Sequence, residues 1–353
     1  MNILTQTIEK ITAADAGKRT EARKRLEQLT MPFWALGRLM DLAEELAGMT
    51  RSLNPPVKRK TIVTMAGDHG VVAEGISAFP QEVTPQMVHN IVGGGAGVNA
   101  LARQVGAGVV VVDMGVAVDL GELAASGKIM SRRIAAGTRN MAAGAAMNRA
   151  EAIRAIEAGI DIAIELGPSV DVFGTGEMGI GNTTPSSAIV AVLSGCPVAD
   201  VTGHGTGIGE NQLDHKIRVI EKSIQVNQPD KHDGLDVLAK VGGFEIGGIA
   251  GLILGAASLK KPVVVDGFIS TAGALIAHAL APASADYMIA AHRSMEKGHR
   301  VALDILGKKP LIDLDLRLGE GTGAALAMNF VDAAVRILTD VATFEEAMVS
   351  KST

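Results

Sequence analysis

The residues best placed to do chemistry are four glycines and a carboxylate that follow an apolar run ending at Phe173. The segment reads VDVFGTGEMGIGNTTPSS (170–187), and its NTTP stretch, 182–185, opens a predicted helix. A strand that passes through a glycine turn into a helix N-terminus directs backbone N–H groups at one point, which suits a phosphate. Glu177 adds a carboxylate to the same turn. We therefore expect a site for a sugar phosphate and a second partner that is uncharged or gives up a proton.

The same turn also contains the spacing GxGxxG, from Gly174 to Gly179, which permits a dinucleotide-binding interpretation. Asp200 stands at roughly the distance expected of the acid that binds the ribose. Against this interpretation, Glu177 would lie beside the pyrophosphate, and the stretch after the short helix leaves little room for a second strand. A nicotinamide-dependent oxidoreductase, a non-catalytic nucleotide-binding protein and a purely structural turn stay open from these residues alone.

Glu320 is a second candidate, because it is flanked by glycines in the segment LGEGTG (318–323) that opens a long apolar helix. The helix N-terminus favours the ionised form of a nearby carboxyl group. An ionised carboxylate partly shielded from water can act as a general base. A carboxylate that only caps the helix is the alternative, and it is a common use of this position.

Three further segments carry polar side chains that suit a phosphate, a ribose or a carboxylate. They are TGHGTG (202–207), AHRSMEKGH (291–299) and the helical stretch around Lys216. Glycine turns and a solvated cation are the structural alternatives. Asp68 and His69 form either an acid–base pair or a loop-ordering contact, and the role of His204 is open. We expect no metal, because the histidines lack a ligand spacing and the chain has one cysteine.

Short apolar runs alternate with helical stretches from residue 57 onward, and they indicate the elements that position these residues. Runs of this kind without two-residue alternation are typical of a parallel sheet buried on both faces. The expected fold class is α/β: a Rossmann-like, doubly wound parallel sheet in three layers, with ligands beyond the carboxyl ends of the strands. The runs are Thr61–Ala66, Val109–Met114, Val170–Phe173, Pro262–Val265 and Tyr287–Ala290.

The chain ends are expected to form a second, smaller unit. We expect one helix over residues 14–29 and a second that starts at Pro32. Both precede a candidate domain boundary at Asn54-Pro55-Pro56. We predict a small helical domain from residues 1–56 plus about 339–353. Residues 57–338 then form the large α/β domain that carries the site.

Composition narrows the class of protein. The 353 residues carry a formal net charge of −5 and no long basic block, which argues against nucleic acid as a partner. The single cysteine, Cys196, excludes a disulfide framework. The N-terminus lacks a signal-peptide core, and no stretch resembles a membrane span. We expect a cytoplasmic protein that does not bind membranes.

Taken in order, the motifs resemble one family closely: nicotinate-nucleotide–dimethylbenzimidazole phosphoribosyltransferase, which makes the lower-ligand nucleotide of cobalamin. The resemblance covers most of residues 60–340. The matching segments are AGDHGVV (66–72), FPQEVTPQMV (79–88), GGGAGVNALA (93–102), VFGTGEMGIGNTTPSSAI (172–189), TGHGTG (202–207), VDGFISTAGALIA (265–277), AHRSMEKGH (291–299) and DLRLGEGTGAALAM (315–328).

The resemblance implies transfer of the 5-phosphoribosyl group of nicotinate mononucleotide to 5,6-dimethylbenzimidazole, without a cofactor, by a homodimer. The family's catalytic glutamates correspond to Glu320 and Glu177. Its phosphate- and ribose-binding positions correspond to Gly176, Gly179, Ile180, Gly181, Asn182, Gly203, Gly205, Thr206, Lys216 and Ser294. Its base-binding positions correspond to Pro80, Gln81, Gln86, His89 and Met178.

The implied chemistry requires one general base. The pyridinium leaving group departs as a neutral ring, whereas the benzimidazole must lose its N–H proton as its other nitrogen attacks. The resemblance gives the proton-accepting role to Glu320. The inversion from β to α that the family carries out indicates in-line displacement, helped by orientation and by carboxylates near the cationic ribosyl carbon. The preferred base stays open, because the segment 77–89 varies within the family.

Overall fold

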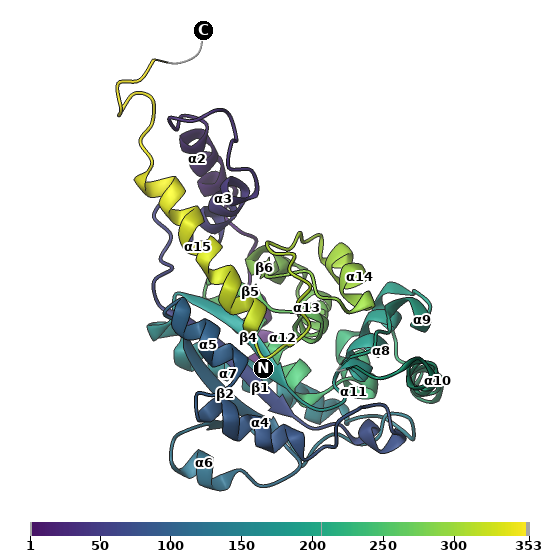
Figure 1. Ribbon diagram of the computed structural model, residues 1–353. Coiled ribbons are helices and arrows are strands. Elements are labelled where there is room, and N and C mark those ends of the chain that lie inside the picture. Colours follow the sequence, from purple (N-terminus) through teal and green to yellow (C-terminus); the bar gives the residue numbers. More distant parts are fainter. Residues whose placement is uncertain (1, 206, 351–353) are drawn as a thin grey trace.

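One six-stranded parallel sheet forms the centre of the computed structural model, which describes residues 2–205 and 207–350 (Figure 1). The strands are β1 (Lys60–Gly67), β2 (Gly108–Gly115), β3 (Met130–Ser131), β4 (Val172–Met178), β5 (Val263–Val265) and β6 (Met288–Ala290). Their order across the sheet is β3-β2-β1-β4-β5-β6. Starting from β1, the strand order therefore proceeds outward through β2 and β3 on one side and through β4, β5 and β6 on the other. The point where the order changes sides, between β1 and β4, is where a doubly wound fold binds its ligand. The predicted α/β fold class is confirmed.

Helices cover both faces of the sheet, and each face has its own cluster of buried hydrophobic side chains. Met65 of β1 belongs to one cluster and Ile62 to the other, because alternate strand residues point to opposite faces. The first face carries α1 (Ile3–Lys10), α7 (Arg149–Leu166), α8 (Thr183–Ser194), α11 (Gly234–Val241), α12 (Phe244–Ser258) and α13 (Phe268–Leu280). The second face carries α4 (Val83–Val92), α5 (Gly97–Gln104) and α15 (Thr322–Asp340).

The remaining elements are short connections and two longer helices, Glu210–Asn227 and Lys297–Leu306, that pack on α8. They are η1 (Gly70–Glu74), α6 (Gly121–Ala125), η2 (Gly167–Ser169), α9 (Val198–Val201), α10 (Glu210–Asn227), η3 (Pro282–Tyr287) and α14 (Lys297–Leu306). Among the described helices, none is both long and apolar enough to cross a membrane.

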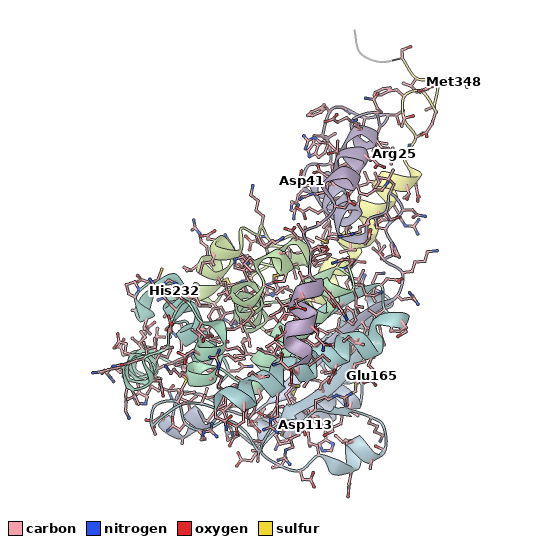
Figure 2. The ribbon with its side chains drawn as sticks, turned by 180° about the vertical axis from the view of Figure 1, so that it is seen from behind. Arg25, Asp41, Asp113, Glu165, His232 and Met348 are labelled. Carbon is pink, nitrogen blue, oxygen red and sulfur yellow. The ribbon has the colours of Figure 1, made fainter. Side chains whose placement is uncertain are left out.

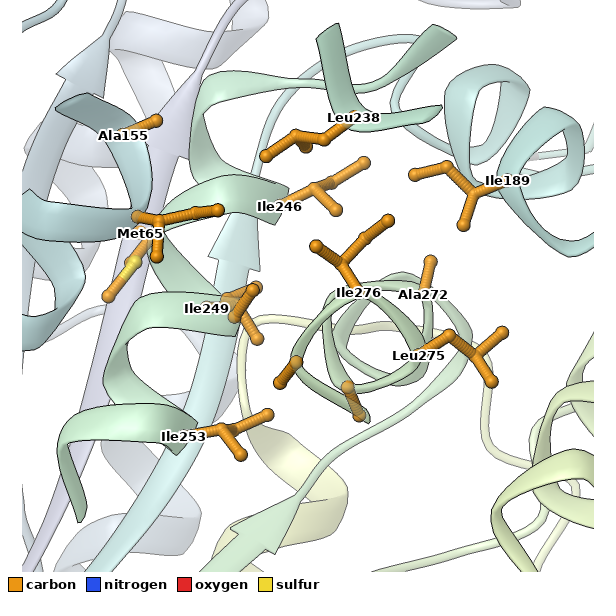
Figure 3. Packing of buried hydrophobic residues seen from close by; sticks show 14 of the residues in the cluster. Met65, Ala155, Ile189, Leu238, Ile246, Ile249, Ile253, Ala272, Leu275 and Ile276 are labelled. Carbon is orange, nitrogen blue, oxygen red and sulfur yellow. The ribbon is translucent and has the colours of Figure 1, made fainter. Parts of the chain in front are cut away.

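Small residues let α7 and α12 pack with their backbones in contact. A Cβ at Gly159 would overlap the carbonyl oxygen of Gly248, and a Cβ at Gly251 would overlap that of Ile156. The core beside this contact consists of aliphatic side chains such as Ile246 and Ile249, which meet α13 (Figure 3). In a chain with 42 glycines and 3% aromatic residues, close approach of backbones at glycine thus accompanies a core that is mainly aliphatic.

β4 runs five residues beyond the predicted end of its strand at Phe173. Gly174 and Gly176 are therefore strand residues and not parts of a turn. The reason is the close approach of the segment around α15: a Cβ at Gly176 would overlap the carbonyl oxygen of Glu320. Glycine in a strand interior often marks such an approach. Since the first two glycines of the GxGxxG spacing lie in β4, the predicted phosphate turn is restricted to residues 179–182.

Residues 16–50 and the segment that follows α15 lie together beside the outer half of α15 (Figure 1). There α2 (Ala16–Leu26) and α3 (Arg38–Thr50) pack on α15. The N–H of Phe344 donates to the Gln28 carbonyl at 2.8 Å, and the Arg25 guanidinium contacts the Glu346 carboxylate at 3.0 Å. Figure 2 shows Arg25 at this end of the molecule, far from Asp113 in the sheet. α1 is the exception, because it packs on α7 and α12.

The helix predicted to start at Pro32 begins only at Arg38. Trp34 and Gly37 have left-handed backbone, with φ of 52° and 48°, which a right-handed helix does not accommodate. The Trp34 indole N–H instead donates to the Asp41 carboxylate at 2.8 Å.

Candidate active site

A cavity of about 320 Å³ lies beyond the carboxyl ends of β4, β5 and β6. Its walls include both predicted catalytic glutamates, Glu177 and Glu320, although they are 143 residues apart in the chain. Asp266, which directly follows β5, and His292, two residues after β6, also line it. Strand ends of a parallel sheet meet at one edge, so the fold gathers these side chains into one site.

Glu320 is positioned by the start of α15 and by the N-terminal end of α5. The carboxylate oxygen Oε2 accepts a hydrogen bond from the Val98 N–H at 3.1 Å. Burial raises the pKa of Glu320, and the N–H groups of Val98 and Gly97 oppose that rise. A carboxylate whose pKa is raised toward the working pH is better suited to accept a proton.

The backbone of Glu320 is left-handed, with φ of 62°, a conformation that costs a residue with a side chain about 1–2 kcal/mol. Neighbouring strand ends hold it there. The Glu320 N–H donates to the Glu177 Oε1 at 3.3 Å, and its carbonyl accepts from the Thr64 hydroxyl at 3.0 Å. The carboxylate of Asp266 accepts from the next N–H, that of Gly321, at 3.2 Å. β1, β4 and the residue that follows β5 thus each contribute one side chain to this turn.

Glu177 occupies the end of β4 and is 6% exposed. Its oxygen Oε2 accepts a hydrogen bond from the Asn182 amide at 2.5 Å. Burial, together with the negative charges of Asp266 and Glu245, raises the pKa of Glu177 to about 8, although the Asn182 amide opposes the rise. A pKa of about 8 makes Glu177 mainly the neutral acid at pH 7.

The predicted phosphate turn and Lys216 meet at one end of the cavity. Gly179, Ile180, Gly181 and Asn182 line the cavity where α8 begins. The Lys216 ammonium group donates to the Thr183 hydroxyl at 2.7 Å and to the Gly203 carbonyl at 3.2 Å. Burial lowers the pKa of Lys216 to about 8, with Glu296 opposing. A buried cation beside a helix N-terminus suits a phosphate.

The other predicted phosphate and ribose residues are spread around this end. Gly205 and Ser294 line the cavity, as does His204. Gly203 reaches the site through its carbonyl contact with Lys216, while Gly176 lies in β4 behind the Glu320 turn. Thr206 falls outside the described residues.

The predicted base-binding residues are only partly at the cavity. Met178 lines it, but Pro80, Gln81, Gln86 and His89 are not among its wall residues. The same segment contributes other side chains instead, namely Ser77, Phe79, Val83 and Met87. Positions 83 and 87 share one face of α4, whereas the side chains of residues 86 and 89 are exposed to solvent. The apolar pair at i and i+4 was the signal that could have identified the inner face.

Asp68 and His69 stand behind the site and do not line it. The His69 Nε2 lies 2.6 Å from the Glu245 Oε1, and both side chains are buried. A Cβ added at Gly179 would lie 3.3 Å from the His69 Nε2. The His69–Glu245 pair thus lies behind Gly179 of the phosphate turn, on the side away from the cavity. This placement favours a loop-ordering contact for His69 over an acid–base role.

The dinucleotide interpretation does not fit this arrangement. Gly174 and Gly176 are in β4, and Asp200 lies in the short helix α9 and not at a strand end. Among residues 2–205 and 207–350, no group of three or more histidine, cysteine, aspartate or glutamate side chains is placed to hold a metal ion.

Comparison with known proteins agrees with this architecture. A family model described as Phosphoribosyltransferase matches residues 11–349. The chain is 66% identical to the nicotinate-nucleotide–dimethylbenzimidazole phosphoribosyltransferase of Syntrophotalea carbinolica and 58% identical to that of Desulfotalea psychrophila, each over 99% of both chains. Its structure is similar to the crystal structure of CobT from Thermus thermophilus, with a TM-score of 0.91 and 44% identity over 95% of this chain and 100% of that one.

Proposed function

We infer the reaction and the part of each residue from one premise: the chain belongs to the nicotinate-nucleotide–dimethylbenzimidazole phosphoribosyltransferase family. It is a pentosyltransferase of cobalamin biosynthesis that transfers the 5-phosphoribosyl group of nicotinate mononucleotide to dimethylbenzimidazole. The products are α-ribazole 5′-phosphate and nicotinate.

Lys216, the start of α8 and the turn at 179–182 bind the 5′-phosphate in this proposal. Support comes from the buried ammonium group, which faces the same end of the cavity as the α8 N-terminus. A phosphate dianion there gives Lys216 a charged partner, whereas its hydrogen-bond partners within the protein are the neutral Thr183 hydroxyl and Gly203 carbonyl. The ribosyl carbon then lies toward the two glutamates.

Glu320 is the general base. One benzimidazole nitrogen attacks the ribosyl C1′ while the C1′–N bond to the nicotinate ring breaks, and the bonding pair stays on that ring nitrogen. The proton on the other benzimidazole nitrogen passes to Glu320. The apolar wall of Met178, Phe79, Val83 and Met87 is the expected location of the aromatic base. Pro80, Gln81, Gln86 and His89 stay a prediction as base-binding residues.

Glu177 stabilises the positive charge that the nucleotide brings. A cation next to a buried carboxyl group favours its ionised form, so binding of the pyridinium nucleotide lowers the pKa of Glu177 from about 8. The observation that carries the proposal is that both glutamates, Glu177 and Glu320, line one cavity with Lys216.

The test is Glu320→Gln, with nicotinate release from nicotinate mononucleotide and dimethylbenzimidazole as the readout. We expect kcat to fall by about 10²- to 10⁴-fold, the usual contribution of a general base, with nearly unchanged nucleotide binding. Glu165→Gln is the matched control, because Glu165 is exposed on α7 (labelled in Figure 2) and is not a wall residue of the cavity. Turnover by Glu320→Gln at the rate of the control would remove Glu320 from the mechanism.

Three further properties belong to this proposal. We propose a homodimer, a cytoplasmic location and the division into a small helical and a large α/β domain. The first follows from the family resemblance, and the second is in keeping with the single cysteine, which is free. The contacts of Phe344 with Gln28 and of Glu346 with Arg25 support the third. Light scattering of the purified protein tests the dimer directly.

A further inference from the structure

The Glu320 carbonyl lies against two neighbouring strands, β1 and β4, and a threonine of β1 donates a hydrogen bond to it. Thr64 of β1 lies opposite Gly176 of β4 in the sheet register. The Thr64 hydroxyl donates to the Glu320 carbonyl at 3.0 Å. A Cβ at Gly176 would overlap that carbonyl and would stand 2.8 Å from the Thr64 Oγ1. The missing side chain at 176 is what allows the Glu320 turn to reach Thr64.

Thr64 is not placed to contact a substrate in the cavity. Its exposed fraction is 0%, and it is not one of the wall residues of the cavity. Any effect of its hydroxyl on the reaction must therefore pass through the turn that it contacts. The Thr64 hydroxyl is the side-chain donor that another strand offers to the carbonyl of this turn. The left-handed backbone of the turn directs the Glu320 side chain into the cavity.

We propose that Thr64 is a positioning residue, whose hydroxyl holds the left-handed backbone of Glu320 so that the carboxylate faces the attacking base. Gly176 serves the same purpose by leaving room for the carbonyl. This inference rests on the proposed role of Glu320 as the general base. It assigns no chemical step to Thr64.

The test compares Thr64→Val, which keeps the shape but removes the hydroxyl, with Thr64→Ser, which keeps the hydroxyl. A displacement on the scale of 1 Å at a reacting group costs about 10²-fold in rate. We expect Thr64→Val to lower kcat by about 10- to 100-fold, with KM for nicotinate mononucleotide within about twofold of wild type. Thr64→Ser restores most of kcat. Thr61→Val, on the same strand but away from the cavity, is the control for replacing a strand threonine.

Each outcome has a separate meaning. A loss of kcat in Thr64→Val, recovered in Thr64→Ser, supports the inference. Full kcat in a folded Thr64→Val overturns it, and so does an equal loss in both variants. If Thr64→Val does not fold, Thr64→Ala and Thr64→Ser are compared in the same way. The proposed function fails independently, through normal turnover of Glu320→Gln.

Discussion

Lys216→Met is expected to weaken binding of nicotinate mononucleotide and, without phosphate or nucleotide in the assay, to stabilise the fold by removing a buried charge. The Lys216 side chain is 1% exposed, and its ammonium group has only a hydroxyl and a carbonyl as hydrogen-bond partners. Burial lowers its pKa from 10.5 to about 8. At about 1.4 kcal/mol for each pKa step, the difference of about 2.5 amounts to about 3 kcal/mol, which is the order of the cost of keeping the charge in the folded state.

The sign of the pH dependence follows from linkage. The unfolded chain, with a lysine pKa near 10.5, binds more protons than the folded protein above pH 8, so the lysine makes the free energy of unfolding rise with pH through that window. Between pH 7 and pH 9.5 this rise is about 2 kcal/mol. Lys216→Met lacks it. The measurable quantity is the free energy of unfolding of wild type minus that of the variant, which increases by this amount.

Urea unfolding at the two pH values, with and without inorganic phosphate, measures this quantity. Phosphate is expected to stabilise the wild type at pH 7 and to have little effect on Lys216→Met, because an anion bound to the folded state shifts the equilibrium by mass action. A wild-type-minus-variant difference that stays flat between pH 7 and pH 9.5 would refute the buried charge. Equal stabilisation of both proteins by phosphate would refute the assignment of Lys216 to the phosphate.

Two other perturbations separate the remaining roles. Gly176→Ala is expected to lower kcat by about tenfold or more with little change in KM for nicotinate mononucleotide, because the added Cβ would overlap the Glu320 carbonyl. A rise in KM alone would instead indicate that residue 176 contacts the phosphate. For Glu177→Gln, we expect the KM of the variant divided by the KM of the wild type, both for this nucleotide, to rise with pH and to level off above about pH 8. The reason is that only the wild type gains a carboxylate that attracts the cation as pH rises. A ratio independent of pH would mean that Glu177 does not titrate in the site.

The sequence was sufficient for the α/β class and for the positions of the long elements. The start of α7 (149–166) is an example of a local signal, because Asn148 accepts a hydrogen bond from the Glu151 N–H at 2.8 Å and caps the helix. Such signals are local: caps, helical periodicity and apolar runs lie within a few residues of the element that they define. β3 was not predicted, because its two residues form no apolar run and pair only at the edge of β2.

The site required the tertiary structure at three points. The sequence placed Glu177 and Glu320 next to glycines, but only the sheet order brings them into one cavity. The glycine at 174 was interpreted as part of a turn, although its lack of a side chain makes room for α15, which is distant in the chain.

The orientation of α4 likewise decided that Met87, and not Gln86, faces the cavity. The types of the reacting groups are thus determined by the sequence. Their directions are not, because burial, pKa and left-handed backbone arise from neighbours that the fold brings from other strands.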